Sequence, residues 1–216
     1  SDLIGAIQHP EDGYIQPADL TQALATGARN RGAEIYRNTT VVGIKQTKNG
    51  WVVETDKGTI ECEHVVSCSG NFARQTGKMV GLEIPVIPVE HQYIVTEPHP
   101  EIQKRKKEGL PEMGVLRDSD SRWYMREEAG GLILGPYEDG APCCYVDGPS
   151  KDSEYELFQE DLERLAPHIE GAIHRVPAFG EVGVKKVYNG AICYTPDGNP
   201  IVGPAWGLKN FWINEG

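Results

Sequence analysis

The sequence has no long apolar run and no excess of basic residues. Its apolar stretches span only a few residues, whereas a membrane-crossing helix needs roughly 20. Acidic residues number 32 against 21 lysines and arginines, which gives a net charge of −11. This balance argues against nucleic-acid binding, because such binding requires a basic surface that displaces counterions from phosphate. We therefore expect neither a membrane nor a nucleic acid among the partners of the chain.

Cysteine and histidine spacings typical of metal sites are also absent. The five cysteines contain no CxxC pair, and no HExxH motif occurs. An odd number of cysteines without a secretory signal is typical of reduced thiols. We accordingly expect no metal, and we expect the protein in the cytosol or in an organelle matrix. A redox role for the adjacent Cys143 and Cys144 is the less favoured alternative.

Glycine-rich phosphate loops are missing as well. No GxGxxG spacing occurs, and Gly70 and Gly77 have six residues between them rather than the four of a P-loop. Met79 stands where a P-loop serine or threonine would bind magnesium. Taken alone, this absence argues against a nucleotide-binding protein.

The periodicity of the apolar residues predicts short helices and strands. Pro17 begins a helix that Gly32 ends, because proline suits the first turn and glycine the position after the last turn. A second clear helix is expected over residues 153–165, with Ser153 as its cap, Glu156 in the capping box and Pro167 after its end. Shorter helices are expected over residues 72–80 and 102–107.

Segments rich in β-branched and aromatic residues predict the strands. They comprise residues 33–36, 41–46, 51–56, 59–62, 65–68, 86–96, 115–118, 122–127, 132–135, 184–194 and 210–213. Many strands with few helices between them indicate an antiparallel sheet in the region after residue 81. We expect a mixed α/β (α+β) fold.

Two polar residues inside predicted strands are candidates for a functional site. His91 shares one strand face with Tyr93, and an imidazole beside a phenol can line a polar pocket. Tyr124 lies in another strand. Packing in the core is the competing interpretation for both candidates. The chain has no Ser/His/Asp triad and no distinctive carboxylate pair, so its side chains offer binding and proton transfer beside a cofactor.

Seven segments together resemble the dimethylglycine/sarcosine dehydrogenase and oxidase group of the D-amino-acid-oxidase-like flavoproteins. They are EDGYIQP at residues 11–17, NTTVVGI at 38–44, VVSCSG at 65–70, PVEHQY at 88–93, TEP at 96–98, YMRE at 124–127 and YTPDGNP at 194–200. The segments follow the order of the family over nearly the whole chain.

The resemblance implies a flavin-dependent enzyme that oxidises small N-methylated amino acids by hydride transfer to FAD. It implies that His91 and Tyr124 line the amine pocket as catalytic residues. It implies cofactor contacts from Val41, Ser67, Cys68, Ser69, Gly70, Pro196, Asp197 and Gly198. Candidate cations for a substrate carboxylate are Arg117, Arg122 and Arg126, but a surface pair of Arg126 with Glu127 or Glu128 is the favoured interpretation.

The family begins with a GxGxxG unit, so the resemblance also implies that this chain is an internal fragment of a longer, two-domain flavoprotein. We expect residues 1–80 and 189–216 to be parts of the FAD-binding domain and residues 81–188 to be the substrate domain. The remaining FAD-domain segments of the parent chain would complete the cofactor site, so FAD binding by the fragment is expected to be incomplete. The alternative is a non-catalytic binding or interaction module that is inactive as an isolated fragment.

Overall fold

The structure is a computed structural model that describes residues 2–216, and these residues form two compact units. Unit 1 comprises the residues up to 35 together with 92–138 and 160–188. Unit 2 comprises residues 36–91, 139–159 and 189–216. Each unit has its own hydrophobic core. The domain boundaries expected at residues 80 and 188 remain a prediction.

Unit 1 is built on a sheet with the strand order β6-β7-β8-β5-β9. The strands are β5 (Ile87–Thr96), β6 (Leu116–Asp118), β7 (Trp123–Glu128), β8 (Gly131–Pro136) and β9 (Val184–Tyr194), of which β5 and β9 continue into unit 2. The pairs β6–β7, β7–β8 and β8–β5 are antiparallel. Ala129 and Gly130 join β7 to β8 with φ angles of 50° and 83°, the positive values that a tight two-residue hairpin requires.

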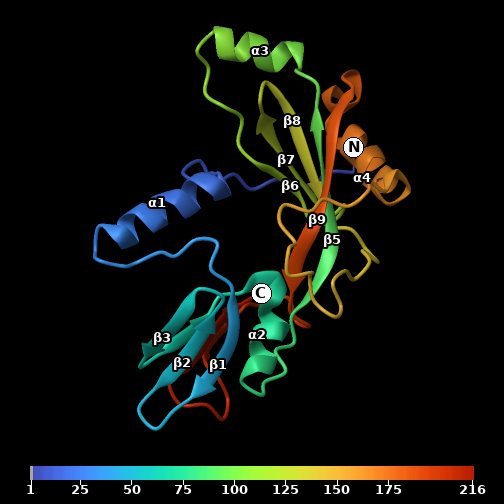
Figure 1. The fold of residues 1–216 in the computed structure, drawn as a ribbon. Helices are drawn as coiled ribbons and strands as arrows, with labels where there is room; N and C mark the ends of the chain where they lie inside the picture. The colour runs from blue at the N-terminus through green and yellow to red at the C-terminus, as the bar shows by residue number, and fades with distance from the viewer. Residues whose placement is uncertain (1) are drawn as a thin grey trace. The chain divides into compact units, whose positions relative to one another are not determined.

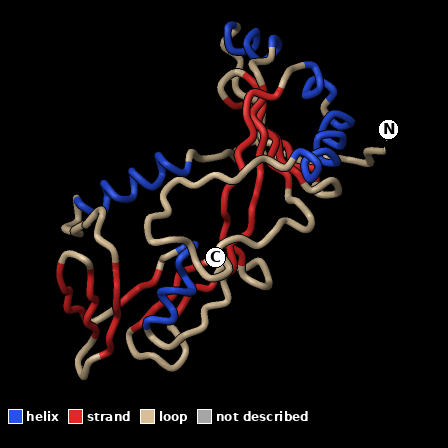
Figure 2. The backbone as a smooth tube through the Cα atoms, turned by 45° about the vertical axis from the view of Figure 1, so that its right-hand side comes forward, coloured by secondary structure: helices blue, strands red, loops and turns tan. Residues whose placement is uncertain are grey.

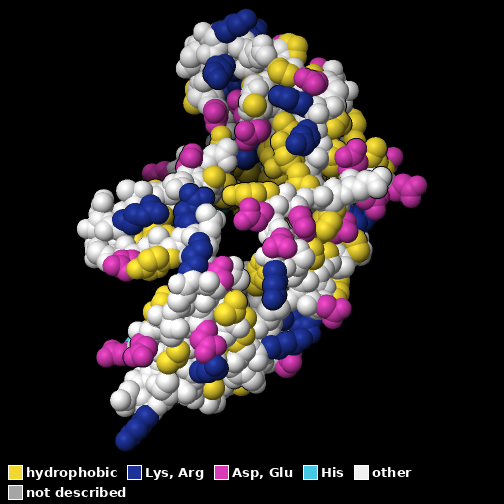
Figure 3. All heavy atoms as spheres, in the orientation of Figure 1, with side chains coloured by type: hydrophobic (Ala, Val, Ile, Leu, Met, Phe, Trp, Pro, Cys, Tyr) yellow, Lys and Arg dark blue, Asp and Glu magenta, His cyan; other side chains and the backbone are white. Residues whose placement is uncertain are grey.

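Four helical segments belong to unit 1: α1 (Pro17–Arg29), α3 (Pro100–Lys107), α4 (Leu162–Arg175) and the 3₁₀ turn η2 (Pro177–Glu181). Helix α4 lies along the sheet and packs Leu165 and Ala172 against Trp123, Met125 and Leu134 (Figure 1). Basic side chains gather over α3, whose last turn contains Lys104, Arg105, Lys106 and Lys107 (Figure 3). One face of the sheet is therefore core, and the other face carries the polar residues discussed below.

Unit 2 contains two three-stranded sheets (Figure 2). The strands β1 (Val41–Gln46), β2 (Trp51–Thr55) and β3 (Gly58–Cys62) form an antiparallel sheet. In the second sheet β11 (Phe211–Glu215) is antiparallel to β10 (Ile201–Pro204) and parallel to β4 (Val65–Ser67). Two short helical segments, η1 (Gly70–Phe72) and α2 (Ala73–Met79), follow β4.

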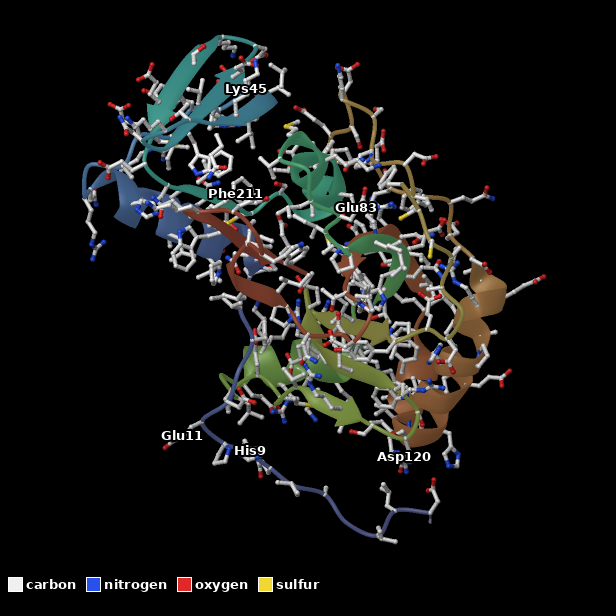
Figure 4. The ribbon with its side chains drawn as sticks, turned by 90° about the horizontal axis from the view of Figure 1, so that it is seen from below. His9, Glu11, Lys45, Glu83, Asp120 and Phe211 are labelled. Carbon is white, nitrogen blue, oxygen red and sulfur yellow. The ribbon has the colours of Figure 1, made fainter. Side chains whose placement is uncertain are left out.

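An aromatic contact joins the two sheets of unit 2 in a common core. The rings of Trp51 and Phe211 lie 5.2 Å apart at 62°, an edge-to-face arrangement that stabilises buried aromatic pairs. Figure 4 shows Phe211 on the side of β11 that faces β1–β3, with Lys45 labelled on β1. Trp51 Nε1 donates to the carbonyl oxygen of Lys209 at 3.1 Å, so its polar atom is satisfied inside the core.

The helix expected over residues 153–165 is wrong. Ser153 Oγ does donate to Glu156 Oε2, but Tyr155 has a φ of 53°, which interrupts a right-handed helix. The helix starts at Leu162, where Asp161 Oδ1 accepts from the backbone N–H of Arg164, and Pro167 lies inside it. The apolar series that faces the core is Leu165, Ile169, Ala172 and Val176.

The strand expected over residues 33–36 is also wrong, and β10 was not expected. Ile35 and Tyr36 are exposed, and residues 33–36 belong to none of the described sheets. The other predicted strands are confirmed to within two residues at each end. The long β9 occupies residues 184–194 as predicted.

Candidate functional site

The predicted site residue Tyr124 lies on the polar face of the unit 1 sheet. Alternation along β7 turns Trp123 and Met125 into the core and Tyr124 and Arg126 to the opposite face. The registers place Tyr124 directly opposite Arg117 of β6 and Gly135 of β8. Tyr124 is half-buried on the face that α4 does not cover, and both the pocket and the core interpretation of this residue remain predictions.

Two residues surround the Tyr124 ring with polar groups. The guanidinium carbon of Arg117 lies 6.0 Å from the ring centroid, and Arg117 Nη1 donates to the hydroxyl of Tyr137 at 3.4 Å. The rings of Tyr124 and Tyr137 are 6.1 Å apart. Burial raises the pKa of the Tyr124 phenol, and the neighbouring Tyr137 adds to this. Tyr124 thus keeps its proton at neutral pH.

Arg126, a second candidate cation, is paired with a carboxylate. Its Nη1 lies 2.5 Å from Glu128 Oε2, which confirms the expected partner. The pair is not on the open surface, however, because only 13 % of the Arg126 side chain is exposed. The Tyr14 ring covers the guanidinium at 4.2 Å, and Tyr14 donates its hydroxyl to Glu112. Arg126 is therefore engaged within unit 1, and the exposed Arg117 is the better placed cation.

A stacked tyrosine pair extends the polar face of the same sheet. The rings of Tyr93 on β5 and Tyr188 on β9 are 4.7 Å apart and inclined by only 17°. Lys186 Nζ lies 4.4 Å from the centroid of the Tyr188 ring. The sequence placed Tyr93 on the face of a site candidate but gave no reason to single out Tyr188. The only signal at position 188 was an aromatic residue in a predicted strand.

His91, the other predicted catalytic residue, belongs to unit 2 and is half-buried in β5. Tyr124 belongs to unit 1. The shared pocket of His91 and Tyr124 therefore remains a prediction.

The predicted FAD-contacting residues Ser67, Ser69 and Gly70 surround a carboxylate of the chain itself. Glu215 Oε1 accepts from Ser67 Oγ at 2.6 Å and from Ser69 N–H at 2.7 Å, and Oε2 accepts from Gly70 N–H at 2.7 Å. Glu215 is only 3 % exposed. Sequence reasoning missed this residue, since a lone glutamate after an apolar strand carries no recognisable signal.

The remaining predicted cofactor contacts lie at loop and strand ends of unit 2. Val41 begins β1 and is exposed. In the turn of Pro196 and Gly198, Asp197 Oδ1 accepts from Asn199 N–H and Thr195 Oγ. The pKa of Asp197 is lowered by hydrogen bonds, first from the Asn199 backbone N–H and then from the Asn199 and Thr195 side chains. The Asp197 carboxylate therefore stabilises the conformation of the turn to which it belongs.

These residues fit FAD through their small size rather than through free charged donors. A side chain at Gly70, whose φ is 56°, would meet only the sulfur of Cys193, at 3.8 Å, so this side of the turn is open to close approach. Cys68 is exposed beside it. The two backbone N–H groups, by contrast, are used by Glu215. The turn therefore suits an uncharged part of the cofactor better than a phosphate.

Within residues 2–216 no three histidine, cysteine or acidic side chains are grouped to hold a metal ion. Over the same residues no helix combines the length and apolar character needed to cross a bilayer. A hollow lined by His9, Pro10, Glu11 and Asp12 contains none of the predicted site residues, and Figure 4 shows His9 and Glu11 on the extended N-terminal segment.

Known proteins place this chain in one family. Human mitochondrial dimethylglycine dehydrogenase is 40 % identical over 99 % of the chain, and mouse mitochondrial sarcosine dehydrogenase is 34 % identical over all of it. The chain spans only 25 % and 23 % of the lengths of these relatives. The structure of L-proline dehydrogenase from P. horikoshii has the same fold over 93 % of the chain and 50 % of its own length, with a TM-score of 0.73 at 24 % identity. The FAD dependent oxidoreductase (DAO) family matches residues 1–216 throughout, and the chain belongs to this family.

Proposed function

We propose that this chain supplies the amine-binding sheet face and part of the FAD-binding walls of an oxidoreductase for small N-methylated amino acids. One observation carries the proposal. Tyr124 and Arg117 stand opposite each other on the sheet face that α4 does not cover, with a half-buried phenol beside an exposed guanidinium. A substrate such as sarcosine or dimethylglycine carries both an amine and a carboxylate, and this face offers a partner for each.

The names of the relatives support the substrate class. Both relatives act on methylated glycine derivatives according to their names, and the identity of 34–40 % extends across the whole chain. Because the chain covers about a quarter of each relative, the activity is proposed for the complete protein. Both relatives are mitochondrial, which is compatible with the expected cytosolic or organellar location.

Each residue has a distinct role in the proposed mechanism. Arg117 binds the substrate carboxylate, and the protonated Tyr124 phenol orients the amine by hydrogen bonding. His91 favours the neutral form of the amine, because only a nitrogen with a free electron pair assists loss of hydride from its neighbouring carbon. FAD, when bound, supplies the hydride acceptor. The oxidised substrate is an iminium that water hydrolyses.

The cofactor walls are assigned to unit 2. Gly70 and Cys68 provide a small surface beside which FAD can lie, and Val41 presents the start of β1. Pro196, Asp197 and Gly198 present a turn whose shape is held by hydrogen bonds from Asn199 and Thr195. Ser67 and Ser69 contribute indirectly, since they bind Glu215.

Kinetics of the full-length protein test the proposal. We expect Arg117→Met to raise KM for dimethylglycine by about 10- to 100-fold, the loss of one charge-assisted contact, and to leave KM for an amine without a carboxylate unchanged. Tyr124→Phe and His91→Asn should lower kcat/KM. The matched control is Arg29→Met, an exposed arginine in α1 of the same unit. Unchanged turnover and KM in both the Tyr124 and His91 variants would contradict the amine site.

Flavin uptake separates the proposal from a non-catalytic module. Purified full-length protein is expected to be yellow and to show flavin absorbance. Colourless protein that takes up no added FAD and oxidises no N-methyl amine would favour the binding or interaction module instead.

A further inference from the structure

Gly135 lies in the middle of β8 although glycine weakens a strand. The space next to it explains this choice. A Cβ atom at position 135 would overlap Cζ, Cε1 and Oη of Tyr124. The Tyr124 side chain therefore lies across the β8 backbone at a point where that strand has no side chain.

The same row of the sheet contains further phenols. Tyr124 is the direct cross-strand partner of Gly135. The β5–β8 register pairs Ile94 with Leu134, and one more residue of this antiparallel register brings Tyr93 beside Gly135. Tyr93 in turn stacks on Tyr188. The row thus runs from Arg117 through Tyr124 and Gly135 to the stacked pair.

The electrostatics agree with this placement. Burial raises the pKa of Tyr93, and the neighbouring phenols of Tyr188 and Tyr124 raise it further. Tyr93 and Tyr124 are close enough for the charge of one to affect the other. The overlap between a Gly135 Cβ and the ring atoms shows that the Tyr124 ring extends over Gly135, on the side of the sheet toward β5.

We propose that Gly135 is a positioning residue that sets the orientation of Tyr124 for amine binding; this rests on the proposed function of Tyr124. With any larger residue at position 135, the ring must swing off β8 and its hydroxyl leaves the row. The competing explanation is that the ring only shields a strand glycine and stabilises the sheet. The two explanations differ in whether displacement of the Tyr124 ring changes turnover.

The direct test observes Tyr124 in the full-length protein. We would introduce 3-fluorotyrosine at position 124 and follow its ¹⁹F NMR signal against pH with and without Gly135→Ala. The expected result is a shifted resonance and an apparent pKa that moves down toward the value of free 3-fluorotyrosine. An unchanged resonance and titration would overturn the proposal.

Thermal stability gives a second test that also covers a poorly folding variant. If the alanine Cβ collides with the ring, Gly135→Ala lowers Tm in the wild-type background. It should then cause no further loss of Tm when it is added to Tyr124→Ala. A loss that persists in the double variant would overturn the proposal, because the collision would then be with another group. Gly171→Ala is the matched control, since its Cβ meets Ser121 and Trp123 only at an ordinary 3.7 Å.

Turnover distinguishes this proposal from the function on which it rests. We expect Gly135→Ala to lower kcat/KM for dimethylglycine by about 10- to 100-fold, as displacement of a substrate-orienting group by about 1 Å does. When Gly135→Ala is added to Tyr124→Phe, the further loss of kcat/KM should be several-fold smaller than the loss in the wild-type background. A displaced Tyr124 with unchanged turnover would show that Gly135 sets the ring orientation, but it would contradict the assignment of Tyr124 to the amine site and favour the shielding explanation.

Discussion

Glu215 accepts a hydrogen bond from Ser67 at 2.6 Å, and this contact ties the end of β11 to the end of β4. The parallel register pairs Ile213 with Ser67, so Glu215 falls just beyond the last residue of β4. There its carboxylate also accepts from the backbone of Ser69 and Gly70. The turn for which the family resemblance implies FAD contacts is thus held by a residue of β11.

Removal of this carboxylate should destabilise unit 2. Glu215→Ala leaves two backbone N–H groups and one hydroxyl without their acceptor. We expect the free energy of unfolding to fall by about 3 kcal/mol, given a cost of about 1–3 kcal/mol for a buried donor left unsatisfied. Urea unfolding of the full-length protein, followed by circular dichroism, measures this loss.

Glu83→Ala is the matched control for Glu215→Ala. Glu83 is an exposed glutamate of the same unit, so its replacement should change stability by less than about 0.5 kcal/mol. Equal losses of unfolding free energy in the two variants would show that the hydrogen bonds to Glu215 contribute nothing specific to stability.

A second buried carboxylate should make Arg164 indispensable in unit 1. The Glu138 side chain is fully buried and accepts from Gln92 Nε2 at 2.9 Å and from Arg164 Nε at 2.6 Å. Arg164→Met leaves a buried charge without its cation and should cost about 3–5 kcal/mol. Adding Glu138→Gln removes that charge and should recover part of the loss in denaturant unfolding. A double variant less stable than Arg164→Met alone would contradict this account.

Local sequence signals predicted the elements better than they predicted the contacts between them. Most strands were recognisable because each has its own periodicity and turn residues, as in the hairpin at Ala129 and Gly130. The helix expected from Ser153 failed although its side chain does donate to that of Glu156. Such a pair stabilises a local turn, but the helix needs an apolar face, and that face begins only near Leu165.

The site shows the same division between local and distant information. Tyr124 could be singled out because it lies within a segment that resembles a known family. Gly135 and Glu215 could not, since each acts on residues that the fold alone brings beside it. Strand registers decide both contacts, and a single sequence does not specify registers between distant strands.

The adjacent cysteines should differ in reactivity. Burial, followed by the negative charge of Glu90, raises the pKa of the Cys144 thiol to about 11. Each pKa unit changes the thiolate fraction by a factor of ten, so at pH 8 the thiolate fraction of Cys144 is about 100-fold below that of an ordinary thiol. The thiolate is the form that reacts with alkylating reagents. Iodoacetamide should therefore label the exposed Cys143 and Cys68 before Cys144. Peptide mass spectrometry measures the order, and equal labelling rates at pH 8 would be incompatible with it.

The titration of Tyr124 should not appear in the pH profile of turnover. Its pKa lies above the ordinary tyrosine value because burial disfavours the phenolate, so the hydroxyl stays protonated throughout pH 6–9. Tyr124→Phe should therefore lower kcat/KM for dimethylglycine at every pH in this range and leave the apparent pKa values unchanged. Tyr155→Phe is the control, because Tyr155 is 96 % exposed. This substitution should change neither the height nor the shape of the pH profile. If the basic limb vanished in Tyr124→Phe, the phenol would be titrating, and its role would be that of a general base rather than an orienting group.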